Sequence, residues 1–238
     1  MTVQVNQAVR EIVTSNPGAA RTLEKFGIDY CCGGEKSLAD ACSFAKVSME
    51  QVVQELQRPQ MQVEERDWQK APLAELAAFI VSKHHVFTRE EIARLVPLIA
   101  KVVGVHGQNH PELREIQGLF RGLADELTMH MMKEERMLFP YIALLEEALS
   151  KGRRPAPPMF GTVQNPVRMM TLEHDSAGDA LRKIREITGG YTAPEDACIS
   201  YRTLYRALLA FEADLHQHIH LENNILFPRA VELESRAF

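Results

Sequence analysis

The chain has 238 residues, of which 45% are hydrophobic and 25% charged, a composition typical of a globular protein. Its formal net charge of −5 and pI near 6.0 argue against nucleic acid or an anionic membrane as the main partner. There is no apolar run of about 18 residues and no signal-peptide pattern at the N-terminus, so we expect a cytoplasmic protein that does not span a membrane.

Residues 1–57 predict a small helical unit. Capping pairs mark the starts of three short helices: Asn16 with Pro17, Ser37 with Asp40, and Ser48 with Gln51. Gly27 is expected to end the first of these helices, after Phe26. Residues 58–71 are polar, lack a clear period and are interpreted as a linker.

Residues 72–238 predict four amphipathic helices, so the expected fold class is all-α, an up-down four-helix bundle with a small helical N-terminal domain. The second, third and fourth helices carry stripes with steps of three or four residues. They are Ile116, Phe120, Leu123, Leu127, His130, Glu134, Leu138 and Tyr141; Val167, Met170, His174, Ala177, Leu181 and Ile184; and Tyr201, Leu204, Leu208, Phe211, Leu215, His218, Glu222 and Ile225.

The first helix runs from Pro72 past Val103. Its inward face is not assigned by the pattern, because two registers of apolar residues compete. Pro97 interrupts this helix and is expected to kink it. The two registers are Leu73, Ala77, Ile80 and His84, and His85, Ile92, Val96, Ile99 and Val103.

One segment is written twice. His130 and Glu134 are followed by Leu-Phe-Pro at 138–140, and His218 and Glu222 are followed by Leu-Phe-Pro at 226–228. Residues four apart share one face of a helix, so two facing copies would bring two imidazoles and two carboxylates together. Because ionised carboxylates in a bundle core are costly unless paired or metallated, the pattern predicts a metal site.

Each half also has a lone histidine on the preceding helix, His174 in one half and His85 or its neighbour His84 in the other. The set then offers four imidazoles and two carboxylates, enough for two metals bridged by both glutamates. An oxo or hydroxo bridge would leave each metal one open position. Bridging carboxylates in a helical bundle favour two irons or two manganese ions, and we predict iron, although spacing alone does not exclude manganese or zinc.

The remaining histidines and cysteines suit other roles. His216 and His220 flank the His218 stripe and should face another helix or water, and His106 and His110 lie at a helix end. Lys36 and the helix start at Ser37 predict a lowered thiol pKa for the adjacent pair Cys31 and Cys32, which could also form a strained disulfide or hold a soft metal. Cys42 and Cys198 are expected to be buried and inert.

Two groups of residues carry a resemblance to a known family. The loop Asp29-Tyr30-Cys31-Cys32-Gly33-Gly34 resembles the ScdA N-terminal domain. Four segments resemble a hemerythrin-like domain: those around His85, from His130 to Glu135, at Glu173-His174-Asp175, and from His218 to Pro228. Essentially the whole chain thus resembles the iron-sulfur cluster repair di-iron proteins (RIC, YtfE/ScdA type, NorA/DnrN-like).

The resemblance implies a ligand set, with Glu134 and Glu222 as the bridges. It favours His85 over His84, and it makes Glu135 and Glu173 candidates for the outer shell. The implied ligands are His85, His130, Glu134, His174, His218 and Glu222. Ordinary hemerythrins carry a fifth histidine four residues after the equivalent of His174, whereas this chain has Gly178 there, which favours small-ligand reactivity over reversible oxygen carriage.

The resemblance implies repair of iron-sulfur clusters damaged by nitrosative or oxidative stress. The di-iron centre would bind or reduce nitric oxide or donate iron, and Cys31 and Cys32 would assist in redox chemistry or iron handling. The expected partners are nitric oxide or oxygen, damaged iron-sulfur proteins and a second copy of the chain. Two alternatives stay open: a nitric oxide or oxygen sensor or scavenger without turnover, and a di-iron peroxidase or oxidase.

Overall fold

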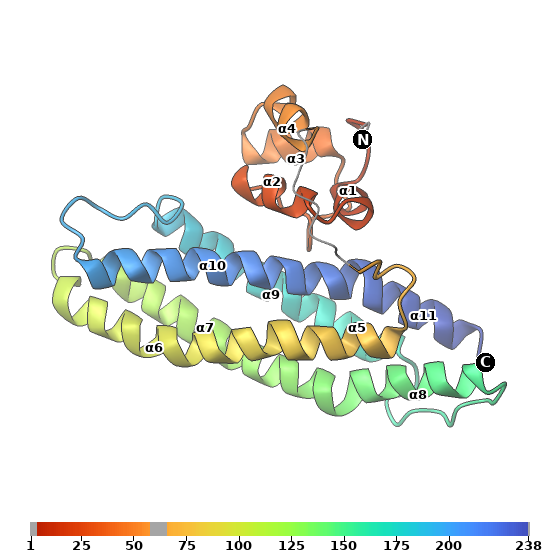
Figure 1. Ribbon diagram of the computed structural model, residues 1–238. Coiled ribbons are helices and arrows are strands. Elements are labelled where there is room, and N and C mark those ends of the chain that lie inside the picture. Colours follow the sequence, from red (N-terminus) through yellow and green to blue (C-terminus); the bar gives the residue numbers. More distant parts are fainter. Residues whose placement is uncertain (1–3, 58–65, 238) are drawn as a thin grey trace.

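The structure is a computed structural model that describes residues 4–57 and 66–237. Within these residues it contains eleven α-helices, three π-helical turns and no β-strand (Figure 1). The nearest approach to a strand is an isolated bridge between Ala8 and Ser37. The prediction of an all-α fold is therefore confirmed.

The N-terminal unit consists of α1 (Val9–Ser15), α2 (Ala19–Lys25), α3 (Leu38–Ala45) and α4 (Met49–Leu56). The predicted caps of α3 and α4 are present: Asp40 N–H donates to Ser37 Oγ at 3.1 Å, and Gln51 N–H donates to Ser48 Oγ at 3.4 Å. Gly27 follows α2 with a φ of 66°, the left-handed conformation that glycine adopts at a helix end.

Two details of this unit differ from the prediction. Helix α1 was not predicted, although Val9, Ile12 and Val13 form its buried face at helical spacing. Helix α2 begins at Ala19, and no side chain caps it, so Asn16 is not its N-cap. Asn16 contributes its backbone carbonyl instead, which accepts from Ala19 N–H at 2.8 Å.

The bundle consists of four long helices, three of which contain one π turn. The first is α5 (Leu73–Ile80), η1 (Val81–His85) and α6 (Val86–His106), and the second is α7 (Glu112–Lys133), η2 (Glu134–Leu138) and α8 (Phe139–Ser150). The third is α9 (Gln164–Ile187), and the fourth is α10 (Ile199–Leu221), η3 (Glu222–Leu226) and α11 (Phe227–Ser235). Figure 1 shows them running lengthwise together, with α6 against α7 and α10, and α7 against α9.

The N-terminal helices lie on the outside of this bundle, above α10 in Figure 1, and α1 contacts η3. The interpretation of residues 58–71 as a linker stays a prediction, because residues 58–65 lie outside the described residues. The end that is described is held in place, since the Arg229 guanidinium donates to the carbonyls of Trp68 at 2.6 Å and Ala71 at 2.8 Å.

The three predicted stripes of the second, third and fourth helices are buried throughout. The first helix differs from the predicted register: Val96 is 43% exposed, while Leu95, Ile99 and Val102 are buried. All four of these residues follow η1, and in this part of α6 the inward face lies one residue earlier than the stripe expected from Val96 and Val103. Helix α6 continues through Pro97.

Buried apolar side chains form two clusters along the bundle. One is built around Leu95, Phe120 and Phe211 and continues into the N-terminal unit, and the other is built around Leu76 and Ile142. Between them lies a layer of buried histidines and glutamates. No helix in the described part of the chain is long and apolar enough to span a bilayer.

Candidate metal centre

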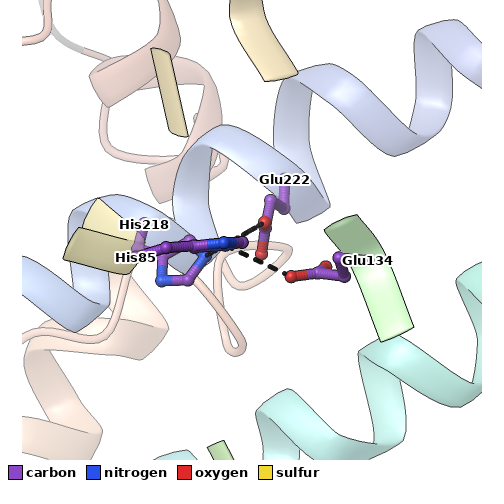
Figure 2. A group of neighbouring side chains, drawn as sticks. All are labelled: His85, Glu134, His218 and Glu222. Atoms are coloured by element: carbon purple, nitrogen blue, oxygen red, sulfur yellow. Dashed lines mark hydrogen bonds and ion pairs between the residues drawn. The ribbon is translucent and has the colours of Figure 1, made fainter. Parts of the chain in front are cut away.

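Six buried side chains, each at most 2% exposed, converge in this polar layer. They form two groups that share both glutamates, and within each group one ligand atom per residue lies within 4.8 Å of the others. The groups are His85, Glu134, His218 and Glu222, and His130, Glu134, His174 and Glu222. Figure 2 shows the first group, in which imidazole nitrogens are directed at the two carboxylates.

The π turns place three of these six residues. His85 ends η1, and Glu134 and Glu222 begin η2 and η3. Pro140 and Pro228 follow η2 and η3, and a proline cannot donate the backbone hydrogen bond of a regular helix, so the repeated Leu-Phe-Pro accounts for the local widening. The repeated segment therefore sets the backbone of the site as well as its ligands.

Outer partners orient three of the four imidazoles. Each of these rings has its Nδ1 next to an acceptor oxygen, so that Nε2, the other ring nitrogen, faces the centre of the layer. The pairs are His85 with Glu135 Oε1 at 2.7 Å, His130 with Glu173 Oε2 at 2.8 Å, and His174 with Asn223 Oδ1 at 2.8 Å.

The facing nitrogens and the carboxylates provide a test of whether a metal fits. His85 Nε2 lies 3.2 Å from His218 Nε2, and His130 Nε2 lies 3.0 Å from His174 Nε2. Both oxygens of Glu134, and Oε2 of its counterpart Glu222, are buried without a hydrogen-bond partner among the described residues.

Imidazole nitrogens that face one another and buried carboxylate oxygens without a partner form a donor set that fits cations placed between them. Mixed imidazole and carboxylate ligands suit iron, manganese and zinc. The six residues predicted from the sequence are thus brought together in an arrangement that could hold a pair of such metals.

The electrostatics of the layer keep both carboxylates ionised. Burial raises the pKa of Glu222, but the imidazoles of His218 and His174 outweigh burial and hold that pKa well below its usual value. The pKa of Glu134 is likewise lowered by His130 against the effects of burial and of the second carboxylate. Burial lowers the pKa of His130, yet Glu134 and Glu173 raise it to about 10.

His84, the competitor of His85, lies outside both groups. Its Nδ1 is 3.1 Å from Asp214, and its ring stacks on that of His218 with centroids 5.7 Å apart. Asn223 was missed by the sequence analysis, because its role depends on a contact with another helix and not on any periodic pattern. Glu135 also contacts Arg89 at 2.6 Å, and Glu173 contacts Lys133.

The other histidines have different partners. His216 and His220 face the N-terminal unit, with ring centroids 6.2 Å and 5.5 Å from that of Tyr30. His106 lies 3.1 Å from the thiol of Cys198 at the far end of the bundle. His110 pairs there with two carboxylates, Glu112 and Asp196.

The expected burial of Cys42 is confirmed, since it is 2% exposed, but the expected burial of Cys198 is wrong. Cys198 is exposed at the N-terminal end of α10, at the end of the bundle, although His106 contacts its thiol.

The vicinal cysteines lie in a tight loop organised by one carboxylate. Asp29 accepts from the backbone N–H groups of Cys31 at 2.9 Å, Cys32 at 3.0 Å and Gly33 at 2.9 Å. The two sulfurs are 3.9 Å apart. Gly34 is required here, because a Cβ at this position would lie 2.5 Å from the carbonyl oxygen of Tyr30.

The expected lowering of the thiol pKa is wrong for Cys31. The contact with Cys32, burial and the nearby Asp29 carboxylate raise the pKa of Cys31 well above its usual value. The predicted cation is directed elsewhere, since Lys36 Nζ lies over the ring of Phe44, 4.4 Å from its centroid.

Comparison with known proteins agrees with this geometry. Residues 76–230 match the family described as the hemerythrin HHE cation binding domain, and residues 5–60 match ScdA_N, a domain of unknown function. The iron-sulfur cluster repair protein YtfE of Pectobacterium atrosepticum is 34% identical over 230 residues, which cover 96% of this chain and 98% of the relative. YtfE of Yersinia pseudotuberculosis is 35% identical over 232 residues, with the same coverage of 96% and 98%.

The family match covers the bundle that contains the candidate metal site, and the similarity to the relatives extends over the N-terminal unit as well. The chain therefore belongs to the hemerythrin HHE family and, within it, to the iron-sulfur cluster repair proteins of the YtfE type.

Proposed function

We propose that the protein holds two iron ions in the polar layer and uses them to repair iron-sulfur clusters damaged by nitrosative or oxidative stress. The observation that carries the proposal is the pair of four-residue groups that share two carboxylates with unpartnered oxygens. The proposed ligands are His85, His130, Glu134, His174, His218 and Glu222, with the two glutamates as bridges.

When bound, the iron pair would supply exchangeable coordination positions and electrons for a small ligand such as nitric oxide. The protein contributes the surroundings. Glu135, Glu173 and Asn223 hold three imidazoles in the tautomer that a metal needs, and the apolar clusters on both sides exclude water from the layer.

The name of the relatives supports a role in cluster repair. The position of the cysteine loop supports the participation of its two thiols in that role. The Cys32 thiol lies 3.5 Å from the backbone carbonyl of His174, so the vicinal cysteines lie next to a proposed ligand. We propose that Cys31 and Cys32 assist either in the reduction of nitric oxide or in the transfer of iron to a damaged client protein.

The test uses the iron-loaded protein and an enzyme whose [4Fe–4S] cluster has been damaged with nitric oxide. The protein should speed recovery of that enzyme or consume nitric oxide in the presence of a reductant. Changing Cys31 and Cys32 together to Ser should leave iron loading unchanged and lower this activity, while Cys198→Ser, far from the layer, should have no effect.

Inactivity of the loaded protein in both assays would refute the proposal. Stoichiometric uptake of nitric oxide that stops without turnover would support the alternative, a sensor or scavenger. The proposal includes a cytoplasmic location, which the four free thiols fit, because cytosolic proteins rarely form disulfides.

A further inference from the structure

Gly178 lies in the interior of α9, one turn after His174. Its backbone is not in the left-handed region that would call for glycine. Glycine in a helix interior destabilises the helix relative to alanine, because it loses more conformational freedom on folding. Neither the helix nor a turn therefore explains a glycine at this position.

The surroundings of the helical glycines differ in one respect. At Gly104, Gly118 and Gly122 an added Cβ would meet nothing within 4 Å. At Gly178 it would meet a single atom, the sulfur of Cys32, at 3.6 Å. This is the place where the cysteine loop covers the surface of α9.

The Cys32 thiol also has a polar partner at this place. Its sulfur lies 3.5 Å from the carbonyl oxygen of His174, the carbonyl to which a regular α-helix directs the N–H of Gly178. The thiol, the glycine and the backbone of a proposed metal ligand therefore meet at one point.

The loop cannot easily adjust if this point is obstructed. Asp29 fixes its backbone through three N–H groups, one of them from Cys32. On the opposite side, Asn224 Nδ2 donates to the carbonyl of Tyr30 at 3.3 Å, and the Tyr30 ring packs against His220. A movement of the Cys32 backbone would have to break one of these contacts.

We propose that Gly178 is a positioning residue: the missing side chain forms a notch on α9 that seats the Cys32 thiol against His174. A methyl group at residue 178 fits, because 3.6 Å is an ordinary van der Waals distance, but a longer side chain would displace the sulfur. The contact of the Cys32 thiol with Gly178 and His174 does not depend on the proposed function. Only its relevance to cluster repair rests on that function.

The test compares Gly178→Gln with Gly178→Ala in the full chain, prepared with and without iron. The readouts are the alkylation rate of Cys32 by iodoacetamide, resolved by peptide mass spectrometry, and amide hydrogen exchange across residues 29–34. Gly178→Gln should raise both at least about tenfold by opening the loop locally, and Gly178→Ala should stay within about twofold of the parent chain. Exposed Cys198 provides an internal reference whose rate should not change.

Unchanged alkylation and exchange in a folded Gly178→Gln chain would overturn the proposal. If that chain fails to fold, Gly178→Ser provides the same comparison with a smaller side chain. A second measurement uses Cys32→Ala, in which Gly178→Gln should no longer speed the exchange of residues 29–34, because the sulfur it would displace is absent. An equal effect in that background would also refute the seat, whereas a failure to bind iron would count against the proposed function alone.

Discussion

The two shared glutamates lead to a prediction about metal stoichiometry. Glu134 belongs to both four-residue groups, whereas His85 belongs to one. Glu134→Ala therefore removes one of four ligands from both groups, while His85→Ala leaves the other group complete. We expect Glu134→Ala to bind well under two irons per chain, and His85→Ala to retain about one, because a site with its full ligand set keeps its affinity.

The assay is anaerobic loading with excess ferrous iron, removal of unbound metal, and iron per chain by mass spectrometry. Circular dichroism verifies that each variant keeps its helices. Glu212→Gln is the matched control, since Glu212 is a buried glutamate on α10 that pairs with Arg185 outside the layer. Full iron content in Glu134→Ala, or complete loss of iron in His85→Ala, would refute the shared-bridge assignment.

Three further predictions concern residues around the layer. Glu135→Gln and Glu173→Gln should each weaken metal binding about 10–100-fold in a competition titration, since both carboxylates orient ligands; unchanged affinity would contradict that role. Because its raised pKa of about 10 keeps His130 protonated at neutral pH in the metal-free chain, metal binding must release a proton. Manganese affinity measured by calorimetry should therefore rise with pH between about 7 and 9, and a flat profile would contradict this. Arg185→Met should lower the free energy of unfolding by about 2–3 kcal/mol in urea, less than for a fully buried pair because Arg185 is partly exposed, while iron content stays unchanged; a stability loss near zero would show that Glu212 does not need this partner.

Most of the bundle could be predicted because the spacing of apolar residues along each helix shows which face of that helix is buried. In the second, third and fourth helices the inward residues recur every three or four positions, and all are buried. The paired His130 and Glu134 fall within the same pattern, as do His218 and Glu222. Ligands that occupy a regular stripe can thus be found without knowledge of the tertiary structure.

The first helix shows why periodicity alone failed to separate His84 from His85. The stripe that ends at Ile80 points to His84, and the stripe expected after it points to His85, but Val96 in that second stripe is exposed. Both histidines are buried, because η1 joins two helical registers that differ by about one residue. A pattern search that assumes one period cannot detect such a change.

Three-dimensional contacts that no periodic pattern records account for the remaining errors. Asn223 orients His174 from another helix, and the contact with Cys32, burial and Asp29 raise the pKa of Cys31, where the sequence pointed to a lowering by Lys36. Cys198 is exposed because of its place at the end of the bundle. These outcomes depend on which side chain reaches a given point in space, and neighbours in the sequence do not determine that.

The sharing of Glu222 between both groups also has a consequence for the order of synthesis. His85, His130, Glu134 and His174 leave the ribosome earlier, but neither group is complete until the helix that carries Glu222 has formed. A growing chain therefore presents partial ligand sets only, and the full affinity arises when the last long helix docks. Metal capture would in this way be deferred until the fourth long helix has formed, and a bound metal would then tie together helices that were made at different times.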